Sequence, residues 1–330
     1  MTCISRGLYI ESDEFYAYSF HFFAIFQIPL HILGTYLILY KTPKNMQGVK
    51  YAMLLLHGSS VFLDVYLNIL TIPYIIFPAS SGYPLGVLLY LGVPTSVMVY
   101  FGISALFMMG AAVLMFFEDR YNRLVRTDAG TRERNNKRAV FFILNYIVVF
   151  VAILPAFQNI PDPEEAKKTV LIDYPCLPHS FVERPGYFKL TNTTAILVGC
   201  LVFYIIFCSV QVFYFVIGTS LKLFRTKAQS QRTSEMQRKF FKMLCLQVSV
   251  PFIAIFTPCV YINLAAALDY VDILLANFSM IWITLHGILS TVTMIAIHKP
   301  YRRAVLEILM FKRFVSTTPM LVARTSVSIK

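Results

Sequence analysis

The chain has few charged residues for its length. Only 14% of its 330 residues are Asp, Glu, Lys or Arg, whereas 57% are hydrophobic and the mean hydropathy is +0.65. A soluble domain is usually about 25% charged and about 45–50% apolar. Because too few polar side chains are present to cover a water-exposed surface, the composition argues against an ordinary soluble protein and indicates one that lies in a lipid bilayer.

Motifs for catalysis and for metal binding are also missing. The sequence has no His-Glu-x-x-His, no Gly-x-Ser-x-Gly and no phosphate-binding glycine loop, so we expect no enzyme. Its six cysteines form no Cys-x-x-Cys and no His/Cys cluster with metal-ligand spacing, so we expect no metal and no cofactor. The first sixteen residues do not have the pattern of a cleavable signal peptide, and the first apolar run is expected to direct insertion.

Long apolar runs dominate what remains. They are continuous over about 20 or more residues instead of alternating in polarity, which predicts an all-α bundle and not a β-barrel. Charged and turn residues divide them into seven spans, the third long and tilted. The spans are expected at about residues 17–40, 51–77, 92–117, 139–157, 195–218, 243–268 and 273–297. They leave an N-terminal segment (1–16), a long loop (about 158–194) and a tail (298–330).

Basic residues are distributed unevenly among the connections. The first, third and fifth connections and the tail hold 24 of the 29 Lys and Arg residues. Basic residues concentrate on the cytoplasmic side of membrane proteins, so we expect the N-terminus outside and the C-terminus inside. The net charge of +12 is then explained by a face near anionic lipid headgroups. The expected partner is the lipid bilayer, and no nucleic acid is expected.

The segment after the seventh span has an amphipathic pattern. Arg303 and Glu307 are on one face of a helix, and the apolar residues on the other are Ala304, Val305, Ile308, Leu309 and Phe311. This pattern predicts a short interfacial helix on the inner leaflet.

Asp64 is the only acidic residue deep within a predicted span. A carboxylate in hydrocarbon is costly, so it should face the bundle interior and have a partner. Asn68, four residues on, shares its helix face, and Pro73 is expected to kink the outer part of the helix. Two interpretations stay open: an ion or proton site coupled to helix movement, or a hydrogen-bonded acid that ties helices together.

Glu118-Asp119-Arg120-Tyr121 lies at the inner end of the third span. Asp119 and Arg120 there are expected to take part in an ionic lock that opens when helices separate, unless they are only an ordinary basic flank. In the sixth span, Pro251 and Pro258 each remove a backbone hydrogen bond and bend the helix. A bent helix can act as a lever whose movement opens the inner face of the bundle. Proline is also common in spans without such a role.

Two modifications are expected on the outer side. Cys3 and Cys176 are the only cysteines predicted there, and the oxidising exterior favours a disulfide between them. Asn192-Thr193-Thr194 is a glycosylation sequon, although it lies very close to the fifth span.

Several short blocks, in order along nearly the whole chain, resemble one family. They are IPLHILGTYLILYKTPKNM, the segment around Asp64 and Pro73, PYIIFPASSGYPLGVL, GVPTSV, FEDRYNRL, YPCLP and HKPYRRAV. The chain resembles the nematode serpentine chemoreceptors of class H, which are seven-transmembrane, G-protein-coupled receptor-like proteins. Two features depart from the broader rhodopsin-like pattern: no cysteine opens the third span, and Asn-Pro-x-x-Tyr is absent from the seventh.

The resemblance implies a chemosensory receptor at the plasma membrane of sensory cilia. It implies binding of a small odorant or soluble chemical and signalling to a heterotrimeric G protein. Arg120 is then similar to the inner-face arginine that engages the G protein or its lock. The residues implied to line the coupling surface are Lys222, Arg225, Arg238 and Lys239.

A ligand pocket is expected between the outer halves of the spans, where a small molecule can be enclosed. The candidates, chosen by depth and polarity, are Tyr100, Ser104, Tyr261, Asn263, Asn277 and Trp282. The alternative for each is a packing residue or an interface aromatic.

Two other functions stay open from the sequence. A ligand-gated ion channel subunit with seven spans is opposed by the charge bias, because such channels have the N-terminus inside. A small-molecule transporter would normally have internal repeats or several intramembrane charges. Assembly into a homo- or hetero-oligomer stays open.

Overall fold

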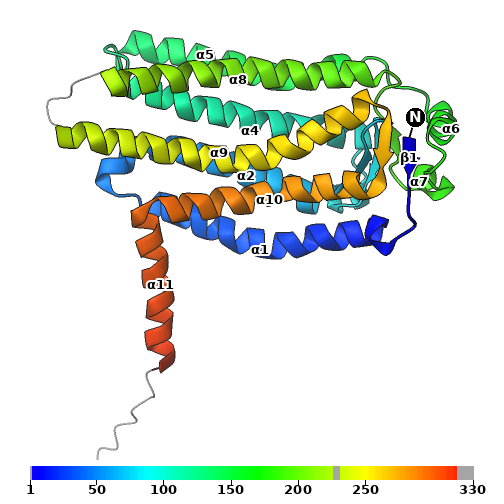
Figure 1. Ribbon diagram of the computed structural model, residues 1–330, viewed down its shortest axis with the longest axis horizontal. Coiled ribbons are helices and arrows are strands. Elements are labelled where there is room, and N and C mark those ends of the chain that lie inside the picture. The colour runs from blue at the N-terminus through cyan, green and yellow to red at the C-terminus, as the bar shows by residue number, and fades with distance from the viewer. Residues whose placement is uncertain (1, 226–230, 318–330) are drawn as a thin grey trace, which may run out of the picture.

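Seven long apolar helices lie side by side in the computed structural model, which describes residues 2–225 and 231–317 (Figure 1). Each is long and apolar enough to cross a bilayer. They are α1 (Asp13–Tyr40), α2 (Gln47–Val65) with its extension η3 (Tyr66–Thr71), α4 (Thr95–Leu124), α5 (Arg132–Val151), α8 (Thr194–Arg225), α9 (Gln231–Ala267) and α10 (Ile273–Ile297). The predicted all-α bundle of seven spans is confirmed.

The two ends of the bundle are built differently. One end carries the elements β1 (Thr2–Ile4), η1 (Tyr9–Glu11), β2 (Pro73–Ile76), β3 (Ser81–Pro84), α3 (Val87–Tyr90), η4 (Leu154–Phe157), α6 (Pro163–Asp173), α7 (His179–Glu183), β4 (Phe188–Lys189) and β5 (Tyr270–Asp272). We call it the disulfide end, after the Cys3–Cys176 bond. At the other, which we call the basic end, lie the α1–α2 and α4–α5 connections, the end of α8, the start of α9, η2 (Lys44–Met46) and the start of α11 (Lys299–Thr317).

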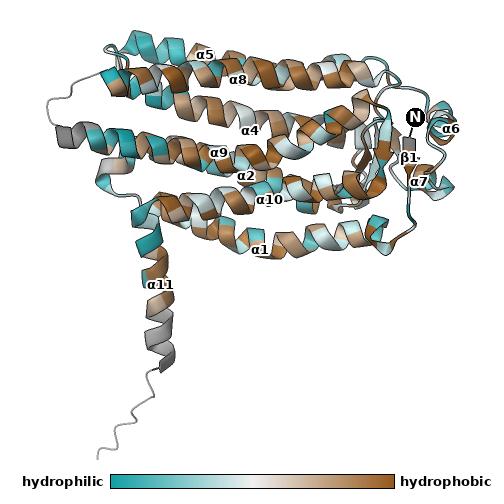
Figure 2. Ribbon diagram, viewed as in Figure 1, coloured by the Kyte–Doolittle hydropathy of each residue, from teal (hydrophilic) through white to brown (hydrophobic). Residues whose placement is uncertain are grey.

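The outer surface of the bundle is apolar along the middle of the helices. Figure 2 shows hydrophobic residues there and hydrophilic ones at the basic end. Large apolar side chains such as Ile147, Ile206 and Phe213 are more than half exposed. Since lipid tails are as apolar as these side chains, their exposure is favourable only inside a bilayer.

Polar side chains cap the N-termini of α1, α5, α6 and α10. Ser12, Thr131, Asp162 and Asp272 each accept a hydrogen bond from a backbone N–H in the first turn of α1, α5, α6 and α10, respectively. These bonds satisfy donors that have no partner within the helix.

The second span ends differently from the prediction. The helix was expected to run to residue 77 with a kink at Pro73, but it ends in the wide π-helical turn η3. Ile72 then takes a left-handed conformation (φ 39°), and Pro73 begins strand β2. Proline has no N–H to donate, and the first residue of a strand tolerates this. β2 pairs antiparallel with β3, and β3 pairs with β4.

The long loop is also more ordered than the sequence indicated. Residues 158–194, expected as a loop, contain the helices α6 and α7 and strand β4. The Asp162-Pro163 pair explains the start of α6, because a capping carboxylate followed by proline at the first helical position is a strong helix start.

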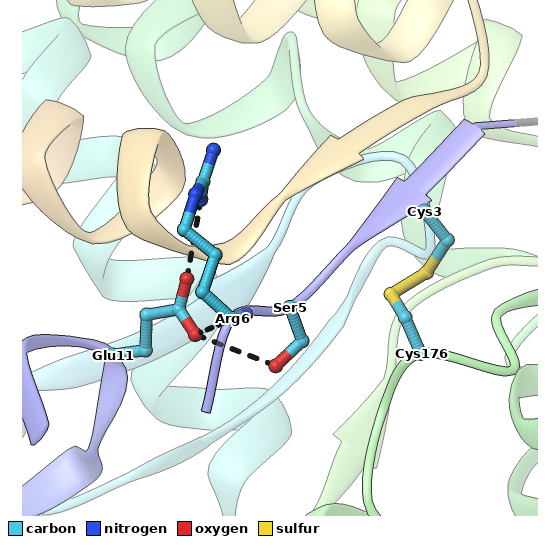
Figure 3. Close-up of a disulfide and its surroundings, with 5 residues drawn as sticks. All are labelled: Cys3, Ser5, Arg6, Glu11 and Cys176. Carbon is cyan, nitrogen blue, oxygen red and sulfur yellow. Dashed lines mark hydrogen bonds and ion pairs between the residues drawn. A yellow bond between two sulfur atoms is a disulfide. The ribbon is translucent and has the colours of Figure 1, made fainter. Parts of the chain in front are cut away.

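Three connections hold the N-terminal segment against the bundle. Strand β1 pairs parallel with β5, and the Cys3–Cys176 disulfide joins β1 to the long loop, with the two Cα atoms 5.6 Å apart (Figure 3). Arg6 donates to both carboxylate oxygens of Asp272, at 2.9 and 2.7 Å, and also pairs with Glu11. The hydrogen bonds from Arg6 lower the pKa of Asp272. The pair is therefore fully formed at neutral pH and weakens only as acid protonates Asp272.

Removing the disulfide should loosen this end. The bond closes a loop of 173 residues and so restricts the unfolded chain. Its loss therefore raises the conformational entropy of the unfolded state and makes unfolding more favourable. We expect Cys3→Ser to lower the free energy of unfolding by about 2–4 kcal/mol. Thermal unfolding of the purified protein would measure this, with Cys245→Ser as the control, because Cys245 is a free cysteine in the half of α9 nearer the basic end. Equal melting temperatures for the two variants would contradict this expectation.

Five helices extend past their predicted bounds at the basic end. α4 continues from residue 117 to Leu124, and α8 continues from residue 218 to Arg225. α2 begins at Gln47 instead of near residue 51, α5 at Arg132 instead of near residue 139, and α9 at Gln231 instead of near residue 243. A helix satisfies its own backbone hydrogen bonds, so it needs no lipid to continue into water. Midway, α9 contains Pro251 and Pro258 and changes direction (Figure 1).

Helix α11 leaves the bundle at a steep angle to α10 (Figure 1). Tyr301 is fully buried and its hydroxyl lies 2.8 Å from that of Thr42, which anchors the helix to the α1–α2 connection. Leu309 stays exposed, as the predicted interfacial helix requires. Phe311 is outside the described side chains, and residues 318–330 of the predicted tail are outside the described residues.

Candidate functional site

A cavity of about 330 Å³ lies towards the disulfide end. Its walls come from α2, α4, α8, α9 and α10, and the β2–β3–β4 sheet covers it at that end. Enclosed apolar cavities of this size hold small molecules in many proteins. The cavity is therefore the candidate ligand site.

Two tyrosines fix the helices around the cavity. Tyr66 from η3 donates to the carbonyl of Met98 at 2.7 Å, and Tyr204 from α8 donates to that of Phe107 at 2.5 Å. The Tyr204 ring also stacks on Phe107, with centroids 3.9 Å apart. Gly110 leaves room for this approach, because a β-carbon there would lie 3.2 Å from the Tyr204 ring.

Of the six predicted pocket residues, only Asn263 lines this cavity. Trp282 is half exposed on the outside of α10, where its ring suits the lipid, so its assignment to the pocket is corrected. Tyr100 is also turned away and donates to the carbonyl of Phe150 on α5. Depth and polarity could not distinguish the face of a helix that lines the cavity from the face that contacts lipid or another helix. That distinction depends on how each helix is rotated about its axis, which the sequence does not give.

The other three pocket candidates lie within the protein but away from the cavity. The Ser104 hydroxyl on α4 is buried and has no hydrogen-bond partner among residues 2–225 and 231–317, and Asn277 donates to the carbonyl of Glu11 at 3.3 Å. Tyr261 is partly buried and packs against the core from α9. None of the three is among the residues that line the cavity.

Asp64 lies in a buried polar cluster between α1, α2 and α10. His31 Nε2 is 2.7 Å from Asp64 Oδ2, and His286 Nδ1 is 3.2 Å from Asp64 Oδ1. His286 Nδ1 is nearer to the carbonyl of Ile283, at 2.8 Å, so Oδ1 has no hydrogen bond within the described residues. Gly287 makes the approach possible, because a β-carbon there would stand 1.5 Å from Oδ2.

A second set of polar contacts joins the same helices. Asn68 donates to Gln27 on α1, and Gln27 donates to the carbonyl of Thr284 on α10. In the Asp64 cluster, His57 Nε2 lies 3.2 Å from the carbonyl oxygen of His31. Asp64 and Asn68 therefore each connect the second span to α1 and α10, through separate hydrogen bonds. Within the described chain, no group of three His, Cys, Asp or Glu side chains is arranged to hold a metal ion.

At the basic end, acids on α4 pair with arginines on α5. Glu118 is only 1% exposed and accepts from Arg134 at 2.9 Å and from Arg138 at 2.8 Å. Asp119 accepts from Arg123 at 3.0 Å and lies 3.4 Å from Arg138. The ion pairs of this end thus join α4 to α5, a partner that the sequence did not indicate.

Arg120 is buried between α4 and α2. Its guanidinium donates to the carbonyl of Gly48 at 2.6 Å and pairs with Asp119. Its Nε is buried and has no hydrogen-bond partner in the described part of the chain. Asp119 and Arg120 form an ion pair, and Arg120 is also hydrogen-bonded to the backbone of α2.

The four other basic residues assigned to the coupling surface differ in environment. Arg238 on α9 donates to the carbonyl of Leu223 at 2.9 Å, which ties α9 to the last turn of α8. Lys222, Arg225 and Lys239 are exposed at the same end. Asn192 is exposed at the opposite end, two residues before α8 begins.

Sequence reasoning missed most partners in both clusters. His31, Gln27 and Gly287 gave no separate signal, because a single histidine, amide or glycine in an apolar run usually reflects packing alone. Arg134 and Arg138 were visible only as part of a basic loop. Their spacing of four residues, which puts both on one helix face, was the available signal.

Known structures share this architecture. The structure matches that of squid rhodopsin with a TM-score of 0.53, covering 99% of this chain and 97% of that one, at 14% sequence identity. At this identity the match shows the fold alone. The chain is thus a seven-helix membrane protein with the fold of rhodopsin.

The family follows from the sequence comparisons. The model of the serpentine type 7TM GPCR chemoreceptor Srh family matches residues 11–311, and the chain belongs to this family. It is also 23% identical over 309 residues to serpentine receptor class H-72 of Caenorhabditis elegans, covering 91% of this chain and 87% of that protein. This is a family of receptors, and the suspected family is confirmed.

Proposed function

We propose that the protein is a chemosensory G-protein-coupled receptor. A small molecule occupies the cavity near the disulfide end and favours one helix arrangement, in which the basic end engages a heterotrimeric G protein. The observation that carries the proposal is that one continuous helix, α4, lines the cavity with residues up to Val113 and holds Arg120 seven residues further on. That spacing is about 10 Å along a helix.

The orientation proposed is that the disulfide end faces the exterior and the basic end the cytoplasm. The disulfide supports it, because such bonds persist in oxidising surroundings. The concentration of arginine and lysine at the other end supports it as well. We place the receptor in the plasma membrane of sensory cilia, as befits its family.

Arg120 is proposed as the residue on the output path. It is 6% exposed here, so a G protein could reach it only after α2 moves away from α4. A ligand that binds the separated arrangement more tightly would shift the population towards it. The bend of α9 at Pro251, a residue that also lines the cavity, offers a second connection between the two ends.

Asp64 is proposed to tie helices together and not to bind an ion. Its carboxylate contacts α1 and α10 directly, and no group of three metal-type ligands surrounds it among the described residues. The tie would keep α1, α2 and α10 as one unit while α9 moves.

The test is a calcium-imaging screen of soluble and volatile chemicals in cells that express the chain with a promiscuous Gα subunit. We expect hits whose responses vanish when G-protein turnover is blocked. Arg120→Ala, compared at matched surface expression, should lower the response at least about tenfold, since removing a coupling contact of about 1.4 kcal/mol has this effect. Arg126→Ala is the matched control, because Arg126 is an arginine just after α4 that is 42% exposed and pairs with the exposed Asp128.

Responses that persist with turnover blocked would contradict the receptor proposal and favour a ligand-gated conductance. Equal responses of Arg120→Ala and Arg126→Ala would remove Arg120 from the output path while leaving the receptor proposal standing.

A further inference from the structure

The cavity walls carry no charge. Among the described residues that line it there is no Asp, Glu, Lys, Arg or His. Most of its polar side chains are already bonded: Tyr66, Tyr204, Thr71 and Thr95 each donate to a backbone carbonyl. A charged ligand would lose its hydration here without compensation, which is strongly unfavourable.

One lining residue keeps unused polar capacity. The side-chain carbonyl oxygen of Asn263 is buried without a hydrogen-bond partner among the described residues. The Asn263 amide nitrogen is occupied by the carbonyl of Cys259, at 2.7 Å. A neutral ligand with one hydrogen-bond donor would satisfy the Asn263 oxygen, whereas a fully apolar one would leave it unpaired.

The route from water is covered. Strand β3 lies over the cavity, and all four of its residues are buried. β3 is held between β2 and β4, and Thr194 of α8 donates to the carbonyl of Pro78 in the β2–β3 turn at 2.9 Å. The disulfide and the Arg6 ion pairs hold the segments around this sheet in place.

The side wall between α8 and α9 is weaker. The lining residues Ile205 and Ser209 on α8 are partly exposed, and Phe252 and Phe256 on α9 are 50% and 44% exposed. Along the described membrane-spanning parts of these helices, the side-chain hydrogen bonds between them lie at the basic end, where Arg238 reaches α8. Only apolar packing therefore closes the cavity towards the lipid.

We propose that the cavity takes a neutral, largely apolar ligand that enters sideways from the bilayer, between α8 and α9. The volume suits about ten non-hydrogen atoms at ~30 Å³ each. Ser209 and Phe256 form the rim of the entrance, and Asn263 binds the polar group of the ligand. This inference rests on the proposed function, because it assigns a ligand class to the same cavity.

Photolabelling of the full chain in phosphatidylcholine nanodiscs tests the proposal without a G protein. The probe is octanol carrying a diazirine, and octyl sulfate carrying a diazirine is its charged counterpart. Mass spectrometry should find the octanol label on cavity residues of α4, α8 and α9, and excess plain octanol should remove it. The sulfate should leave these residues unlabelled. Asn263→Leu should weaken octanol labelling.

Two pairs of variants test the entrance. Ser209→Trp should slow labelling of the cavity by about tenfold or more, since a bulky side chain must move aside for each entry. Val210→Trp is its control, because Val210 is 64% exposed and does not line the cavity. Phe256→Ala should speed labelling, whereas Phe213→Ala, an outward-facing control on α8, should not.

Equal rates for all four variants, or faster labelling after cleavage of the disulfide alone, would overturn the lateral entrance. Cavity labelling by the sulfate, or its absence with octanol, would overturn the ligand class. These outcomes leave the receptor proposal intact, because that proposal depends on G-protein activation in the chemical screen. Conversely, labelling as expected in a protein that activates no G protein would remove the receptor proposal and keep the cavity assignment.

Discussion

Gly287→Ala should prevent most of the expressed molecules from folding correctly. The new β-carbon would stand 1.5 Å from Asp64 Oδ2, well inside contact distance. Asp64 cannot turn aside without losing His31, and its carboxylate is only 2% exposed. Overpacking and the loss of a buried polar contact together should cost about 3 kcal/mol or more. Size-exclusion chromatography of detergent extracts would show this as loss of the monodisperse peak.

Gly58→Ala is the matched control for this prediction. Gly58 lies on α2, six residues before Asp64, is exposed, and has open space where a β-carbon would lie. Its replacement should leave the peak unchanged or slightly raise stability, because alanine is the better helix former. Adding Asp64→Ala to Gly287→Ala should restore part of the folded protein, since the clashing oxygen is gone. A normal peak for Gly287→Ala alone would show that α2 and α10 do not meet as described.

The second large effect is expected at the basic end. The double variant Arg134→Ala/Arg138→Ala leaves the carboxylate of Glu118, which is only 1% exposed, without its two arginine partners. Breaking a buried ion pair on one side typically costs about 3–5 kcal/mol. Thermal unfolding in detergent should therefore show a marked fall in the melting temperature.

The control for this loss is the double variant Arg126→Ala/Arg132→Ala, which removes one exposed arginine from the α4–α5 connection and one exposed arginine from the start of α5. Arg126 and Asp128 are both about 40% exposed, so their ion pair should contribute at most about 1 kcal/mol. Adding Glu118→Gln to the first double variant should recover much of the stability, because a neutral amide is cheaper to bury than a charge. Equal melting temperatures for the two double variants would contradict the buried position of Glu118.

The spans were predictable because hydrocarbon permits few solutions. A run of about 20 apolar residues has to be a helix, so hydropathy alone located all seven. Helix ends were less predictable, since they depend on local competition. Ile72 and Pro73 end the second span in a turn and a strand, although the apolar run continues to Phe77. The helices in the long loop were missed because hydropathy carries no signal outside the membrane.

The site was predictable only where the bilayer penalises a residue. Asp64 stood out because a carboxylate is rare within a span, and the structure gives it partners on two other helices. Its partners did not stand out, because histidine and glutamine are less costly to bury. A pocket between the spans was expected, but its lining was unpredictable, since the residues that face it are set by helix rotation and by the covering sheet. Asn263 and Trp282 are similar by depth and polarity, yet only Asn263 lines the cavity.

The most direct test of the account is nucleotide exchange with purified components. The receptor in nanodiscs, a heterotrimeric G protein and one compound from the screen are combined, and GTP analogue binding is measured. The compound should accelerate exchange on the wild-type protein and on Val97→Trp, which alters an exposed residue of α4 outside the cavity. Ile103→Trp, which fills the cavity from the same helix, should abolish the acceleration in a protein that remains folded. Equal acceleration with Ile103→Trp, or none with the wild-type protein, would contradict the claim that this cavity controls a G protein.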